Sequence, residues 1–153
     1  MKMRRYRYFG AYVVTLAVTT FILHFIWESF HVSLYGGYEN LSPYLPITLW
    51  ATLGDVLYTF GAFLLWFVVR KRVAFTNAAR GADYFFFVLA GFAIALFVEY
   101  KALTLGSWYY LPEMPIIPFL KVGLTPVLQM TILLPLSIFI TEKIMAWRRS
   151  RLF

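Results

Sequence analysis

Few side chains in this sequence can do acid–base chemistry, and the most informative ones interrupt long apolar runs: His24, Glu28, Asp55, Glu99 and Gln129. His24 and Glu28 are four residues apart, so in a helix their side chains lie on one face and can hydrogen-bond directly. Such a pair suits proton transfer at neutral pH. Asp55 and Glu99 could supply a second acid, or a negative charge that stabilises a cationic intermediate. If the protein is an enzyme, we expect His24, Glu28 and Glu99 to be its catalytic residues.

Cofactor chemistry is poorly supported by the residue types. The chain has no cysteine, which excludes a disulfide, a thiolate zinc site, an Fe–S cluster and a cysteine nucleophile. Glu28 and His31 have the Glu-x-x-His spacing of di-iron bundles, but those need a second such motif and two further Glu. His24, His31 and a carboxylate are suitable ligands for one zinc ion. Because His31 falls at or beyond the membrane interface, we predict no metal and no cofactor.

The elements that must position these residues are four apolar runs. The chain is 61% apolar and only 14% charged, against about 45–50% and 25% in soluble domains. Each run is close to the roughly 20 residues that cross a bilayer as a helix. We predict an all-α membrane protein, a four-transmembrane-helix bundle that forms a single domain over residues 1–153. The predicted helices cover about residues 9–30, 46–69, 84–105 and 122–145, with outer loops 31–45 and 106–121 and an inner loop 70–83.

The basic residues predict how the bundle is oriented. Twelve of the fourteen Lys and Arg lie before the first run, between the second and third, or at the end of the fourth. By the positive-inside rule, both termini and the loop 70–83 are cytoplasmic, and the protein is a multi-pass protein of the cell (inner) membrane. The net charge of +7 is therefore a topology signal and predicts membrane lipids, not a nucleic acid, as partners.

Depth along the helices predicts one shared pocket. At 1.5 Å per residue, His24, Glu99 and Gln129 all fall roughly 22–24 Å from the inner ends of their spans. Asp55 is about one turn deeper and Glu28 reaches the outer interface, whereas the inner half has no comparable group. Each of these residues lies on a helix face of small and hydroxylated side chains, which favours packing in a bundle interior. We therefore predict a polar pocket just beneath the non-cytoplasmic face.

Two interpretations of this pocket remain open. Intramembrane ionisable residues are functional candidates, because each costs about 2.5–3.5 kcal/mol to insert near the centre of a helix. In that case we expect Trp27, Asp55, Gln129, Trp108 and Tyr110 to contact a ligand. The alternative is that the polar groups pair with one another and only fix the packing of the helices.

Several motifs resemble known groups of membrane proteins. The motifs are His24-Phe-x-Trp27-Glu28, Gly54-Asp55, Trp108-x-Tyr110-x-x-x-Met114-Pro115 and Gly123-Leu124-x-Pro126-x-x-Gln129. Together they resemble a group of small, uncharacterised prokaryotic four-span membrane proteins, and the likeness covers nearly the whole chain but implies no activity. His24-x-x-x-Glu28 and Gly54-Asp55-x-Leu57-Tyr58 are also similar to motifs of the EXPERA superfamily, which includes the emopamil-binding sterol isomerase and the sigma-2 receptor. The order and spacing of the other acidic residues differ from that superfamily.

These observations leave three functions open. The first is a module that binds or moves an amphipathic lipid or isoprenoid-like ligand, with the polar end of the ligand at the acidic cluster. The second is an acid–base isomerase or cyclase acting on a membrane-soluble isoprenoid. The third is a structural or assembly subunit, either in a homo-oligomer or in a larger membrane complex.

Overall fold

Four long helices make up most of the computed structural model, which describes residues 2–37, 45–70, 79 and 81–151. The helices are α1 (Lys2–His31), α2 (Leu45–Val69), α3 (Gly81–Leu105) and α4 (Leu124–Ser150). Each is long and apolar enough to cross a membrane. The prediction of an all-α membrane protein with four transmembrane helices is therefore confirmed.

The helix bounds differ from the predicted ones mainly at the polar ends. α1 begins at Lys2 and α4 extends to Ser150, because Lys and Arg are good helix formers and continue both helices beyond the apolar runs. α3 begins at Gly81, three residues before its predicted start. The middle parts of the predicted loops 31–45 and 70–83 lie outside the described residues.

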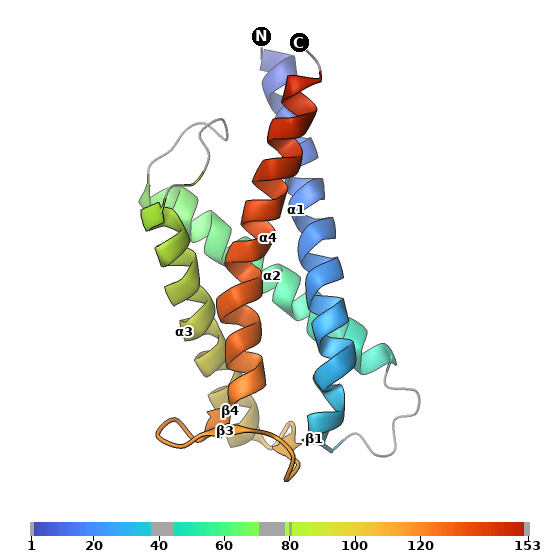
Figure 1. Cartoon of the computed structure of the whole chain (residues 1–153), viewed down its shortest axis with the longest axis vertical. Helices are drawn as coiled ribbons and strands as arrows, with labels where there is room; N and C mark the ends of the chain where they lie inside the picture. Colours follow the sequence, from blue (N-terminus) through green and yellow to red (C-terminus); the bar gives the residue numbers. More distant parts are fainter. Residues whose placement is uncertain (1, 38–44, 71–78, 80, 152–153) are drawn as a thin grey trace.

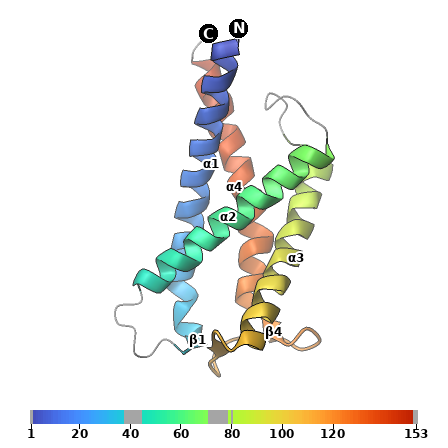
Figure 2. The same ribbon diagram turned by 180° about the vertical axis from the view of Figure 1, so that it is seen from behind.

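The last helix, α4, occupies the centre of the bundle. It packs against α1 and α3, and half of its apolar window is buried, compared with 22% to 28% in the other three helices. Gly91 of α3 explains how closely α3 and α4 approach, because a Cβ there would lie 2.3 Å from the carbonyl oxygen of Met130. Figures 1 and 2 show α1, α3 and α4 roughly along one axis, whereas α2 crosses them obliquely.

Short strands cover the end of the bundle opposite the termini, which we call the loop end. After α1, the 3-10 helix η1 (Val32–Leu34) leads into β1 (Tyr35–Gly36), which pairs antiparallel with β2 (Tyr109–Tyr110). A second antiparallel pair joins β3 (Ile116–Ile117) and β4 (Val122–Gly123). The predicted loop 106–121 thus contains strands, and residues 122–123, predicted as helix, are strand β4. Figure 1 shows these pairs lying across the ends of α1, α3 and α4.

The opposite end, which carries both termini, also contains two acidic side chains that bond other residues, Asp83 and Glu142. Asp83 is 1% exposed, accepts a hydrogen bond from Trp66 Nε1 at 3.0 Å, and pairs with Arg70 Nε at 2.8 Å. Glu142 accepts hydrogen bonds from the Tyr84 hydroxyl at 2.9 Å and from the backbone N–H of Ala79 at 2.7 Å. The prediction that this half has no comparable ionisable group is therefore wrong.

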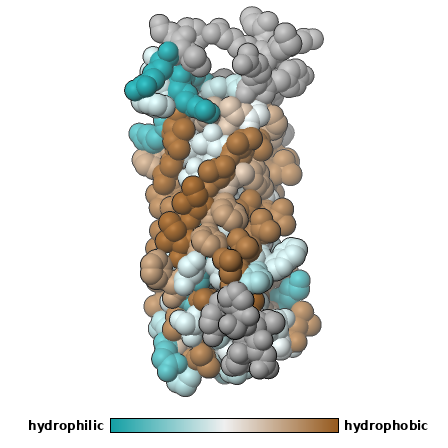
Figure 3. Space-filling view, turned by 90° about the vertical axis from the view of Figure 1, so that its right-hand side faces the viewer, coloured by the Kyte–Doolittle hydropathy of each residue, from teal (hydrophilic) through white to brown (hydrophobic). Residues whose placement is uncertain are grey.

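The surface fits a membrane environment. In Figure 3, apolar side chains dominate the middle of the face, and hydrophilic side chains gather toward the two ends. Large apolar side chains on all four helices are strongly exposed, among them Val14, Leu57, Phe85 and Phe97. This is the pattern expected where lipid replaces water as the solvent.

Candidate functional site

A cavity of about 240 Å³ lies in the loop-end half of the bundle and is lined by residues of all four helices. Most of its lining is apolar or aromatic, as in ligand-binding sites generally. The ionisable and amide side chains that line it are Glu28, His31, Asp55, Glu99 and Gln129. Of the five polar residues that we expected around one pocket, four therefore line one cavity, and His24 lies behind Asp55.

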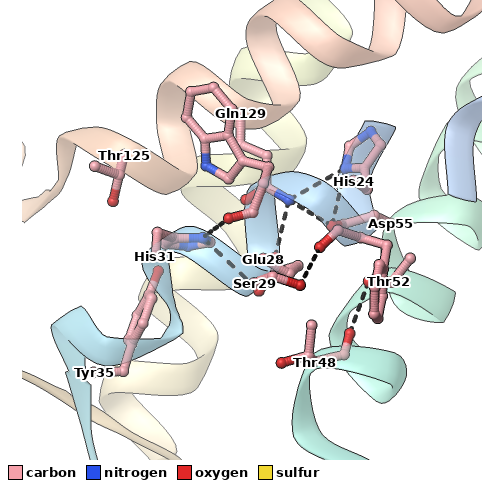
Figure 4. A network of polar contacts seen from close by, with 12 residues as sticks. His24, Glu28, Ser29, His31, Tyr35, Thr48, Thr52, Asp55, Thr125 and Gln129 are labelled. Carbon is pink, nitrogen blue, oxygen red and sulfur yellow. Dashed lines mark hydrogen bonds and ion pairs between the residues drawn. The ribbon is translucent and has the colours of Figure 1, made fainter. Parts of the chain in front are cut away.

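Gln129 is the centre of the polar network. Its amide nitrogen lies 2.9 Å from a carboxylate oxygen of Glu28, 2.8 Å from one of Asp55 and 3.2 Å from Nδ1 of His24. These residues belong to α4, α1 and α2, and Figure 4 shows their side chains pointing toward one another. A single buried amide, only 2% exposed, therefore links three helices.

His24 bonds to a different partner from the predicted one. Its Nδ1 lies 3.0 Å from Asp55 of α2, and no hydrogen bond joins it to Glu28 among the described residues. A carboxylate can only accept, so in the neutral ring Nδ1 carries the proton. Nε2 is then an acceptor that is buried and has no partner in the described part of the chain. His24 is fully buried and does not line the cavity, so its side chain contacts Asp55 from behind and does not face the cavity.

Glu99 lies on another wall of the same cavity and is held by two phenols. One carboxylate oxygen accepts a hydrogen bond from the Tyr35 hydroxyl at 3.3 Å, and the other accepts a short one from Tyr110. Burial, together with the neighbouring Glu99 carboxylate, raises the pKa of both tyrosines above the ordinary value. Both phenols are therefore protonated donors at neutral pH, and they tie α3 to the β1–β2 pair.

Of the other three residues that we expected to contact a ligand, only one lines the cavity. Trp108 lines the cavity, whereas Trp27 and Tyr110 do not. Tyr110 instead donates a hydrogen bond to Glu99. The buried indole nitrogen of Trp27 has no hydrogen-bond partner among the described residues. Among the lining residues with polar side chains, the sequence does not predict His31, Tyr35 and Tyr58 as ligand contacts. The Glu28-x-x-His31 spacing is a signal for the first, because it places both side chains on one face of α1.

Acceptors outnumber donors in this cavity. Three carboxylates line it, and among the described lining residues there is no Lys or Arg. Gln129 supplies the main side-chain donors, and the two hydrogens of its amide group serve the Glu28 and Asp55 carboxylates, which together have four oxygens. The site is therefore suited to a group that donates hydrogen bonds or carries positive charge. In the described part of the chain, no set of three His, Asp or Glu side chains is arranged to hold a metal ion.

The fold and this cavity define the class of the protein: a four-helix membrane protein with a buried acidic cavity toward one end of the bundle. Comparisons with protein-family models, with curated proteins and with solved structures find no match.

Proposed function

We propose that this protein binds, or moves, an amphipathic isoprenoid-like lipid whose polar head occupies the acidic cavity. The observation that carries the proposal is the convergence of Glu28, Asp55 and Glu99 on one cavity inside a membrane-spanning bundle. Carboxylates are costly to insert in a membrane, and polar groups that only fixed packing would be expected to satisfy one another. Here Gln129, His24 and two phenols donate to the carboxylates, but these donors are fewer than the acceptor sites of three carboxylates, so acceptor capacity remains at the cavity.

The charge of the cavity defines the head of the ligand. Glu28 and Asp55 accept from the same amide nitrogen, so their carboxylates are close neighbours and repel each other when both are ionised. A primary amine or ammonium head offers several donors and a positive charge, and therefore matches the site best. A hydroxyl head supplies one donor, and a carboxylate head supplies none and adds repulsion.

The size of the cavity requires the rest of the ligand to lie elsewhere. Sites that enclose a drug-sized ligand have volumes of about 300–1,000 Å³, whereas this cavity has about 240 Å³. It accommodates a polar head and a few carbons. An apolar chain must continue along the helices, where the membrane is its natural environment.

Acid–base isomerisation or cyclisation of a bound isoprenoid is a second candidate. It is favoured by the presence of two carboxylates, Glu28 and Glu99, on different walls of the cavity. His24, which we expected to be catalytic, is behind Asp55 and could act only by positioning it.

The orientation in the membrane is part of the proposal. We place both termini, which lie together at one end in Figure 1, in the cytoplasm, and the protein in the inner membrane. The distribution of Lys and Arg supports this placement, and it puts the cavity in the outer leaflet.

Binding can be tested with probes that share one isoprenoid chain and differ in the head. The full chain is purified in mild detergent, transferred to lipid nanodiscs, and titrated with farnesylamine, farnesol and farnesoic acid while thermal unfolding is followed. We expect the largest stabilisation with farnesylamine and the smallest with farnesoic acid. Mass spectrometry of the purified protein should also show a retained native lipid, and a chemically altered probe would support the enzymatic alternative.

Substitutions connect the binding to the cavity. Glu28→Gln removes one lining carboxyl group, and we expect it to weaken farnesylamine binding about tenfold, or about 1.4 kcal/mol. Glu113→Gln is the matched control, because Glu113 is an exposed acid of the loop end outside the cavity. Protein that retains no lipid, and responds to none of the three probes, would contradict the proposal and favour a structural or assembly role.

A further inference from the structure

We infer that the apolar chain of the ligand leaves the cavity sideways, between α2 and α3, over a patch of small side chains at Ala51 and Gly54. This inference rests on the proposed function, because it assumes that the head of the ligand occupies the acidic cavity. It assigns a chain-binding groove and a route of access from the membrane.

The burial of the lining residues shows which wall is open. Most of those contributed by α1 and α4 are buried, including His31, Gln129 and Met130. Those contributed by α2 and α3 are mostly only half buried: Ile47, Ala51, Gly54, Asp55 and Tyr58 on α2, and Ile94 and Val98 on α3. The cavity therefore opens between these two helices.

The oblique course of α2 produces this opening. Near the termini end, α2 and α3 are joined, since Trp66 donates to Asp83 at 3.0 Å and its ring lies 5.6 Å from that of Phe87. Figure 2 shows the two helices diverging from that point toward the loop end, with α4 behind the gap. The half-buried lining residues of α2 and α3 therefore lie on the two sides of the gap between these helices.

Gly54 marks open space at the mouth of the cavity. It lines the cavity and is half buried, yet a Cβ added there would meet no atom within 4 Å. Ala51 lies one turn earlier on the same face, and its small side chain leaves the space next to Gly54 unfilled. Gly91, at the contact between α3 and α4, has backbone atoms within 3 Å of such a Cβ. The space beside Gly54 is therefore available to another molecule.

An isoprenoid chain is the occupant that these observations favour. The opening lies within the apolar spans, and it continues from a cavity that holds only the head of an amphiphile. The loop end is closed by the β1–β2 pair, where Tyr35 and Tyr110 both bond Glu99. The ligand therefore approaches through the membrane and not through the aqueous end of the bundle.

The test fills the open space beside Gly54 and keeps the three carboxylates of the cavity. Gly54→Leu is compared with Gly61→Leu, which also lies on α2 with no atom within 4 Å of a Cβ but does not line the cavity. In nanodiscs, each variant and the unaltered chain are titrated with farnesylamine and with dimethylallylamine, which has the same head on a single isoprene unit.

We expect Gly54→Leu to weaken farnesylamine binding by about tenfold or more, because each methylene excluded from burial costs about fourfold in affinity. Because Gly54 itself lines the cavity, dimethylallylamine should also lose some affinity, but clearly less than farnesylamine does, and Gly61→Leu should change neither titration. Equal farnesylamine binding by all three proteins would overturn the groove and leave the proposed function intact. If the unaltered chain binds neither amine, the proposed function fails as well.

Discussion

The amide of Gln129 should contribute measurably to stability, because it is the main side-chain donor to the acidic network. Gln129→Leu keeps a similar volume on α4 and removes the amide that bonds Glu28 and Asp55 at 2.9 and 2.8 Å. Hydrogen bonds between membrane helices contribute about 0.6 kcal/mol on average and up to about 1.7. Two such bonds, both to carboxylates, therefore predict a loss of about 1–3 kcal/mol in the free energy of unfolding.

The assay is reversible unfolding from mild detergent into dodecyl sulfate, followed by tryptophan fluorescence. Ser137→Ala is the matched control, because Ser137 is also fully buried on α4 but donates only to the carbonyl of Leu133 in its own helix. We expect that control to change the free energy by less than about 0.5 kcal/mol. If Gln129→Leu is equally mild, then Gln129 does not hold the helices together and our reading of the network is wrong.

Three further predictions concern the packing of α3 on α4, the Asp83 ion pair and the orientation in the membrane. Gly91→Ala should lower the melting temperature strongly, since its Cβ would lie 2.3 Å from a backbone carbonyl of α4, whereas Gly61→Ala should be tolerated. Asp83→Asn should cost about 1 kcal/mol in a dodecyl sulfate titration, because its partner arginine is 41% exposed and partly screened. For topology, a membrane-impermeant maleimide should label Glu113→Cys in intact cells but label Ser150→Cys only after permeabilisation, and the reverse result would invert our orientation.

The sequence was sufficient to predict the helices and the level of the polar network. The rise per residue of a helix is fixed, so position along each apolar run places His24 and Gln129 at about one depth and Asp55 about one turn deeper. Depth alone does not predict which of these side chains bond to one another, because that depends on how the helices rotate and cross. His24 therefore pairs with Asp55 of the obliquely crossing α2 and not with Glu28, its neighbour on α1.

The contacts made by the segments between the helices could not be predicted from the sequence. Tyr35 and Tyr110 converge on Glu99 because β1 pairs with β2, and strands of two residues give no periodic signal. The sequence places Asp83 in the inner loop, because helix boundaries are uncertain by a few residues. It lies in the first turn of α3, facing Trp66.

The central place of α4 has a consequence for biosynthesis. Of the four helices it is the last to leave the ribosome, yet it carries the amide that bonds Glu28 and Asp55. Until it arrives, the nascent chain holds Glu28 and Asp55 in the bilayer without the Gln129 amide, and α3 lacks its main packing partner. Translation that stalls before Leu124 should therefore leave an immature intermediate that membrane quality-control proteases degrade.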